Sequence, residues 1–220
     1  SYLSEDRPDL GCIARQLATG ASRPQEHHWR KLKRVARLLL HRPRLVQKFP
    51  NQSWVESTLD GWSDSNHAGC IRTRKSTSGC AIMVGRSCIK HYARGQGVIA
   101  VSSAEAEFYA LVSCTAQSMA EQTTARDLGL QLSVRIMMDA TAGIAIASRR
   151  GLGKVKHVDT QFLWVQEVIQ NGKIQIKKKH TSEMLADVMT KAVTEPLMNR
   201  MLTTMQFEYR TGQHRLGLKV

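Results

Sequence analysis

The longest helical pattern in the chain runs from about Ser103 to Leu128 and ends at Gly129. Ser102 precedes this helix and Glu105 lies in its first turn, with the S-x-x-E spacing of a capping box. In a capping box a hydroxyl and a carboxylate each accept a hydrogen bond from a backbone N–H. A helix of this length is stabilised mainly by packing its apolar face against other elements.

Glu107 occupies an unusual place on this helix. Ala110 and Leu111 follow it at the i+3 and i+4 positions, so that all three side chains share the face expected to point inward. A carboxylate on a buried face is costly unless it is paired or holds a metal ion. The alternative is an acid in the first turns that simply favours the helix dipole. Position alone leaves both interpretations open.

The segments around this helix predict an α/β fold. Three segments before it have strand patterns and are joined by short turns: Leu59–Ser65, Gly79–Val84 and Cys88–Tyr92. After it come a strand at Val134–Met138, helices at Thr141–Ser148 and from Asp159 to Gly172, a strand at Lys173–Lys179 and a short helix at Glu183–Lys191. The order β-β-β-α-β-α-α-β-α implies a five-stranded mixed sheet, with three antiparallel strands and then two parallel ones, flanked by helices.

Three parts are expected along the chain. Residues 1–50 contain a short helix at about Asp9–Leu17 and a basic amphipathic helix that begins near Glu26 and ends at His41–Arg44. This part buries too little to fold alone, so we expect it to belong to a longer polypeptide. Its basic helix could follow a phosphate backbone or a membrane surface, or could pack against a neighbour with a solvated outer face. Residues 51–195 form the α/β domain, and residues 196–220 a helix and a basic tail.

The charge balance indicates a polyanionic partner. The chain has 32 Lys and Arg against 18 Asp and Glu, a net charge of +14, which is typical of nucleic-acid binding, although a basic protein without such a partner is the alternative. No apolar run is long enough for a membrane span and no signal-peptide pattern is present, so we expect no membrane partner and an intracellular, cytoplasmic or nuclear location. The five cysteines form no C-x-x-C pair, which favours reduced thiols over a zinc site.

Four acids lie beside apolar sequence and are candidate catalytic and metal-binding residues: Asp64, Glu107, Asp139 and Asp187. Asp139 ends an apolar strand, where open α/β sheets place their sites. Each acid alone could be a cap, a turn residue or half of an ion pair. Carboxylates grouped without Cys or His suit Mg²⁺ or Mn²⁺, and two such ions about 3.5–4 Å apart can promote phosphodiester cleavage.

Two basic loops could hold the backbone of a nucleic acid. The first joins the first two predicted strands and the second is Gly-rich, and their candidate contact residues are Arg72, Arg74, Lys75 and Ser76, followed by Arg149, Arg150 and Lys154. The second loop matches no phosphate-binding pattern, so a plain connection is the alternative.

Several ordered motifs carry a family resemblance. They are Trp62–Gly69, Arg74–Gly79, Ser102–Leu111, Lys156–Asp159 and Leu185–Lys191. Together they resemble the ribonuclease H domain of copia-type LTR retrotransposon polyproteins. Residues 2–45 resemble the segment that joins the reverse transcriptase of that family to its ribonuclease H. The resemblance covers roughly residues 2–196.

This resemblance implies a ribonuclease H fold and an enzyme that hydrolyses the RNA strand of RNA–DNA hybrids during reverse transcription. It implies two Mg²⁺ ions per site, with Mn²⁺ able to substitute, and it matches Asp64, Glu107, Asp139 and Asp187 to the catalytic, metal-binding acids of the family. The implied partners are the hybrid and the reverse transcriptase region of the same polyprotein. Hybrid recognition is expected to use backbone shape and 2′-hydroxyls.

The chain departs from the family pattern at a few positions. Asn66 stands where the family usually has a second Asp, and Cys70 where it often has another acid. Gly143 lies in an unusual start for the helix after Asp139, and His180 could help product release or be a solvated loop residue. Two other functions stay open: a decayed, non-enzymatic nucleic-acid-binding remnant, and an integrase-like relative, which fits the spacing of the acids less well.

Overall fold

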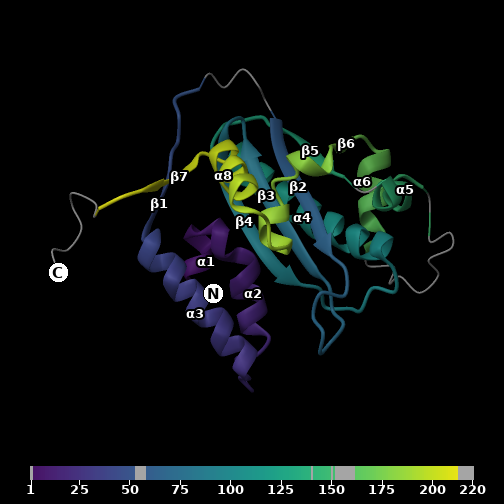
Figure 1. Ribbon diagram of the computed structural model, residues 1–220. Coiled ribbons are helices and arrows are strands. Elements are labelled where there is room, and N and C mark those ends of the chain that lie inside the picture. The colour runs from purple at the N-terminus through teal and green to yellow at the C-terminus, as the bar shows by residue number, and fades with distance from the viewer. Residues whose placement is uncertain (1, 53–57, 140, 150, 152–161, 213–220) are drawn as a thin grey trace.

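The sheet at the centre of the molecule has five strands in the order β4-β3-β2-β5-β6 (Figure 1). A computed structural model of the chain describes residues 2–52, 58–139, 141–149, 151 and 162–212. The strands are β2 (Thr58–Asn66), β3 (Thr77–Val84), β4 (Ser87–Gly95), β5 (Ser133–Met138) and β6 (Ile174–Lys178). β3 pairs antiparallel with β2 and β4, whereas β5 pairs in parallel with β2 and β6. The predicted mixed sheet is confirmed.

Both faces of the sheet are covered by helices, as Figure 1 shows. On one face lie α4 (Ser103–Asp127), α5 (Thr141–Ser148) and α6 (Trp164–Gln170), and on the other lie α7 (Asp187–Thr190) and α8 (Glu195–Thr204). The second half of β3, residues 80–84, is apolar throughout, and this part of the strand is buried on both sides. Its Ile82 joins the core under α4, whereas its Met83 joins the core under α7 and α8.

The long helix α4 begins as its sequence predicts. Ser102 has an extended backbone, and its hydroxyl oxygen accepts a hydrogen bond from Glu105 N at 3.2 Å. The Glu105 carboxylate accepts from Val101 N at 3.0 Å and from the Tyr109 hydroxyl at 2.7 Å. Glu105 therefore has a structural role at the start of the helix. Gly61 of β2 allows α4 to pack closely, since a Cβ there would lie 2.6 Å from the Ser118 hydroxyl oxygen.

The N-terminal helices pack beside the sheet next to β4 (Figure 1). They are α1 (Leu3–Asp6), the 3-10 turn η1 (Pro8–Leu10), α2 (Gly11–Ala18) and α3 (Glu26–His41). The two helices expected in residues 1–50 are confirmed by α2 and α3. α2 contacts both β4 and α7, so this segment lies against the same side of the molecule as the C-terminal helices.

A second, two-stranded sheet was not anticipated. β1 (Arg44–Gln47) pairs antiparallel with β7 (Phe207–Arg210), with Arg44 opposite Arg210. The sequence prediction assigned these segments to a helical tail and to a basic tail. Four-residue strands carry little periodic signal, and their partners lie at opposite ends of the chain, so local pattern does not reveal the pairing.

Two helix predictions in the C-terminal half differ in their outcome. One needs correction, and the start of the other falls outside the described residues. The helix expected at Glu183–Lys191 is instead the 3-10 turn η3 (Thr181–Glu183) followed by the shorter α7. Met184, which lies between them, has an extended backbone with φ −71° and ψ 99°. The chain then packs closely on β3 at Gly79, because a Cβ added to Gly79 would lie 2.9 Å from Ala186 O. Asp159, where the helix ending at Gly172 was expected to begin, lies outside the described residues, and the described helix there, α6, begins at Trp164.

Candidate active site

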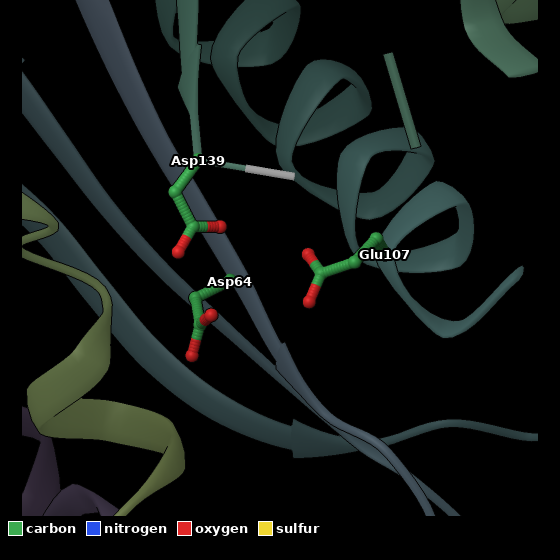
Figure 2. A group of neighbouring side chains, drawn as sticks. All are labelled: Asp64, Glu107 and Asp139. Carbon is green, nitrogen blue, oxygen red and sulfur yellow. The ribbon is translucent and has the colours of Figure 1, made fainter. Parts of the chain in front are cut away.

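Three of the four candidate acids meet at one edge of the sheet. Asp64 lies near the end of β2, and Asp139 directly follows β5, which runs parallel to β2 and therefore ends at the same edge. Glu107 lies in the second turn of α4, the helix that packs on the face of β2, β3 and β5. One carboxylate oxygen of each residue lies within 4.8 Å of those of the other two. Figure 2 shows the three side chains as neighbours, with the carboxyl group of Glu107 pointing towards the two aspartates.

Neighbouring hydroxyls fix the orientation of these acids. The Thr190 hydroxyl donates to Asp64 Oδ2, and the Ser65 hydroxyl donates to Glu107 Oε1 at 2.8 Å. The Thr181 hydroxyl donates to Asp139 Oδ2 at 3.1 Å. Each bond comes from a different segment, so the three carboxylates are held by β2, α7 and the turn after β6.

Burial disfavours the ionised forms of Asp64 and Glu107, and the repulsion between the acids adds to this effect. Glu107 is 6% exposed and Asp64 is 2% exposed. Burial, assisted by the charge of Asp64, raises the pKa of the Glu107 carboxyl to about 8. Burial also raises the pKa of Asp64 to about 6, although the hydrogen bond from Thr190 and the charge of Lys191 act in the opposite direction. A bound cation would remove this repulsion.

The donor set fits a hard divalent cation. Glu107 Oε2 is buried and has no hydrogen-bond partner among the residues that the structure describes. Such an orphaned carboxylate oxygen is costly unless something outside the polypeptide binds it. The acids offer only oxygen ligands, which suits Mg²⁺ or Mn²⁺ better than a metal that prefers sulfur or nitrogen. The Asp64, Glu107 and Asp139 group could therefore hold a metal ion.

Asp187 lies beside this group and outside the set whose oxygens meet within 4.8 Å. It is the first residue of α7 and is 4% exposed. Lys191 Nζ lies 3.0 Å from Asp187 Oδ1 and 3.7 Å from Asp64 Oδ1, so one ammonium bridges the two acids. Burial lowers the pKa of Lys191, and the neighbouring Asp64 and Asp187 raise it by more, so that the net shift is upward.

Sequence reasoning missed the polar residues that support the acids. Thr190 and Lys191 follow Asp187 at i+3 and i+4, a spacing that could have indicated a shared face of a short helix. Asn66, where the family usually has an Asp, donates through Nδ2 to Thr190 O at 3.1 Å. A carboxylate at this position could not make that bond, because an ionised acid only accepts.

Two glycines allow helices to approach the acids closely. A Cβ at Gly79 would lie 2.5 Å from Thr190 Cγ2, so this glycine lets α7 bring Thr190 to Asp64. A Cβ at Gly143 would lie 2.9 Å from Glu107 Cβ, so the unusual start of α5 permits its packing on Glu107. Both helices are therefore positioned by the absence of a side chain.

Without metal, the protein is expected to lose stability as pH rises from about 5 to about 8. The Glu107 carboxyl has a pKa of about 8 in the folded chain against an ordinary value of 4.5. The folded state thus binds this proton more tightly than the unfolded chain, and raising pH between the two values favours unfolding. Urea unfolding in EDTA at several pH values measures the effect. Glu107→Gln should flatten the profile relative to the unaltered protein, and identical profiles would contradict this explanation.

No family model matches this chain. It is 25% identical over 189 residues to the retrovirus-related Pol polyprotein from transposon TNT 1-94 of Nicotiana tabacum, covering 85% of this chain and 14% of that protein. It is 27% identical over 198 residues to the Pol polyprotein from transposon RE2 of Arabidopsis thaliana, covering 88% of this chain and 13% of that protein. The chain is an RNase H-like domain related to the Pol polyproteins of copia-type retrotransposons. It spans about a seventh of the length of these relatives.

This RNase H-like domain also resembles a protein of another kind. It is 34% identical over 113 residues to secreted RxLR effector protein 161 of Plasmopara viticola, covering 51% of this chain and 78% of that protein. Among solved structures, LC11-RNase H1 from compost matches with a TM-score of 0.44 and 14% identity, over 61% of this chain and 93% of that one. The same enzyme was also solved in complex with RNA/DNA hybrid, with a TM-score of 0.40, 12% identity and coverage of 60% and 94%. The fold assignment rests on the strand order and directions described above.

The predicted nucleic-acid contacts of the first basic loop have mixed environments. Arg72 is exposed and its Nη2 donates to Thr19 O at 2.8 Å, whereas Lys75 Nζ donates to Gly97 O at 2.6 Å. Ser76 is fully buried, and its hydroxyl oxygen accepts from Ala68 N at 3.0 Å, so its side chain stabilises the loop internally. Arg74 has a positive φ of 55° within the same loop.

The second loop is only partly described. Arg149 is half-buried, and its carbonyl accepts from Gln170 Nε2 at 3.4 Å. Arg150 and Lys154 lie outside the described residues, as does the Lys156–Asp159 motif. His180 is exposed and caps η3, since its Nδ1 accepts from Ser182 N at 3.2 Å. None of the helices in the described part of the chain is long and apolar enough to cross a membrane.

Proposed function

We propose that this domain is a ribonuclease H that hydrolyses the RNA strand of RNA–DNA hybrids with the help of divalent metal ions. The observation that supports it most strongly is the convergence of Asp64, Glu107 and Asp139, with one oxygen of each within 4.8 Å of the others, on an RNase H-like sheet. Buried acids that repel one another, and whose charges Lys191 offsets only in part, are expected in a metal site. In a structural core they would only be destabilising.

The acids would divide the work of holding two Mg²⁺ ions, with Mn²⁺ able to substitute. Asp64 is central, because it faces Glu107 and Asp139 on one side and the Asp187–Lys191 pair on the other. Bound ions of this kind lower the pKa of water and stabilise the leaving oxygen in phosphodiester hydrolysis. Ser65, Thr181 and Thr190 would keep the carboxylates oriented, as hydrogen-bonding neighbours of metal ligands generally do.

Lys191 would contribute a fixed positive charge to the site. Its ammonium offsets the charges of Asp64 and Asp187 and lies on the exposed side of the group, with its side chain 42% exposed. A cation there can also attract the phosphate of an approaching strand. The net charge of +14 supports a polyanionic substrate in the same way.

The choice of hybrid as substrate follows from the family. The related Pol polyproteins come from retrotransposons, so we place this activity in reverse transcription, inside the cell, with the reverse transcriptase region of the same polyprotein as its partner. On this proposal residues 51–195 form the nuclease domain, and residues 1–50 connect it to the polymerase.

The test compares substrates that share one labelled RNA strand. Cleavage of that RNA is expected in a hybrid with DNA, and only in the presence of Mg²⁺ or Mn²⁺. The same RNA alone, the matching duplex DNA and the hybrid in EDTA serve as controls. Binding of the hybrid without cleavage in either metal would favour a decayed, nucleic-acid-binding remnant, and cleavage of duplex DNA in preference to hybrid would favour an integrase-like activity.

A further inference from the structure

A cavity of about 530 Å³ lies between the N-terminal helices and the β2–β3 connection, outside the acidic group. The Lys, Arg and His residues of its lining form what we call the basic pocket: Arg15, Arg23, His27, His28, Lys31 and Arg72. No Asp or Glu is among the described residues that line it. Two segments distant in sequence, residues 12–31 and the loop after β2, thus bring cations to one cavity.

Among the residues that the structure describes, the cations of the basic pocket have no acidic partners. Lys31 Nζ donates to Gln16 Oε1 at 2.7 Å and Arg72 donates to the Thr19 carbonyl, and both acceptors are neutral. No ion pair within the described part of the chain involves Arg15, Arg23, Lys31 or Arg72. The Nε atom of Arg15 is buried without a hydrogen-bond partner among the described residues. Grouped cations without counter-charge are suited to an anion from outside the chain.

The surroundings of His28 in the basic pocket disfavour a further positive charge. Burial lowers the pKa of His28, and the neighbouring His27, Lys31 and Arg72 lower it further. The pocket therefore has a positive potential that its own residues do not neutralise. Arginine guanidinium groups in such a place bind phosphate oxygens through paired, charge-assisted hydrogen bonds.

The basic pocket adjoins the candidate active site through a shared wall. Thr190 and Asn66 both line the pocket. Thr190 also donates to Asp64, and Asn66 donates to Thr190 O. Thr190 therefore separates the acidic site from the basic pocket, which lies on the side of α2 and α3. A polyanion bound at the acidic site would be close to this pocket.

We propose that the basic pocket binds a backbone phosphate of the nucleic acid whose RNA is cleaved at the acidic site. This inference rests on the proposed function for the identity of the polyanion. It gives residues 1–45 a direct role in substrate binding, in addition to connecting two domains. A phosphodiester suits the pocket because its recognition needs charge and planar donors and no base-specific contact.

The experiment measures binding in EDTA, so that it does not depend on catalysis. A fluorescein-labelled RNA–DNA hybrid is titrated by anisotropy with the unaltered protein and with Arg15→Gln/Lys31→Gln. The matched control is Arg126→Ala/Lys173→Ala, which also removes one Arg and one Lys. Both control residues are exposed, and they lie at the C-terminal end of α4 and just before β6, at the edge of the sheet opposite the acids.

The pocket variant is expected to bind the hybrid about 10-fold more weakly. The slope of its log affinity against log salt concentration should fall by an amount that corresponds to the loss of about one to two phosphate contacts. The control pair should change affinity by less than about twofold. Equal effects of the two pairs would overturn the proposal. Arg23→Gln/Lys31→Gln gives an independent reading if loss of Arg15, which packs on Gly95, lowers stability.

Two further outcomes separate the sources of the anion and the two proposals. If inorganic phosphate alone raises the melting temperature of the unaltered protein as much as the hybrid does, and Arg15→Gln/Lys31→Gln abolishes that effect, the pocket is a small-anion site and the backbone proposal fails. If the pocket pair selectively weakens hybrid binding but no cleavage occurs in Mg²⁺ or Mn²⁺, the pocket proposal holds and the nuclease proposal fails.

Discussion

Asp64→Asn and Glu107→Gln are each expected to reduce hydrolysis of hybrid RNA by about 10³-fold or more, without loss of the fold. Both residues lie in the group whose oxygens meet within 4.8 Å, and each substitution would remove a carboxylate from the proposed metal site. Loss of 10³ in rate corresponds to about 4 kcal/mol of transition-state stabilisation. Cleavage rates in Mg²⁺, together with the change in melting temperature on adding Mn²⁺, measure the two consequences separately.

Glu105→Gln is the matched control for Glu107→Gln. Glu105 lies on the same helix and is also buried, but its carboxylate accepts from Val101 N and the Tyr109 hydroxyl and is not part of the group of Asp64, Glu107 and Asp139. Its substitution should lower the free energy of unfolding by about 1–2 kcal/mol and leave cleavage within a few-fold of normal. Equal cleavage rates for Asp64→Asn, Glu107→Gln and Glu105→Gln would contradict the nuclease assignment. A large loss of cleavage with Glu105→Gln alone would show that the catalytic glutamate is Glu105 and that the assignment of Glu107 is wrong.

Asp9→Ala is expected to lower the free energy of unfolding by about 3–5 kcal/mol, the largest stability effect that we predict. Arg7 and Asp9 are 4% and 7% exposed, and two hydrogen bonds of 2.9 and 2.7 Å join their side chains. Arg7 also donates to Arg42 O at 3.1 Å, and the Tyr209 hydroxyl donates to Asp9 Oδ2 at 2.9 Å. Removing Asp9 would leave a buried guanidinium without its anion and would loosen the contact of the N-terminal segment with β7.

Asp6→Ala provides the comparison, because Asp6 is exposed and lies in the same short stretch of sequence. It should change stability by less than about 0.5 kcal/mol. Chemical unfolding measures the global effect, and proteolysis of residues 1–52 detects local detachment of the segment. The Arg7–Asp9 pair is not the anchor of this segment if Asp6→Ala and Asp9→Ala have the same effect on both measurements.

Local pattern was sufficient for most of the secondary structure. The predicted helix from Ser103 to Leu128 is observed as α4, and the strand predicted at Val134–Met138 is observed as β5 with one more residue. Such agreement is expected, because caps, apolar periodicity and turn residues act over a few neighbouring positions. The same reasoning gave the mixed sheet, since strands reached through helices pair in parallel.

Other features depended on partners that are remote in sequence. Ser76 lies in a basic loop and was expected to contact a phosphate, but folding buries it against Ala68 N. Asp9 was expected only as the start of a short helix, and its importance comes from Arg7 and from Tyr209 near the other end of the chain. Lys191 becomes part of the site only because α7 packs against β2 and β3.

The sequence by itself identified the candidate acids, because each of them stands beside apolar residues. A carboxylate in such a place is costly to bury unless it is paired or holds a metal ion. Only the tertiary structure decided which of them meet. Asp64, Glu107 and Asp139 come together because β2 and β5 are parallel and α4 packs on the face of both strands. Asp187 is placed beside Asp64, and Lys191 contacts both of these acids. The distance between side chains is set by strand order and helix packing, and these depend on contacts among residues far apart in the chain.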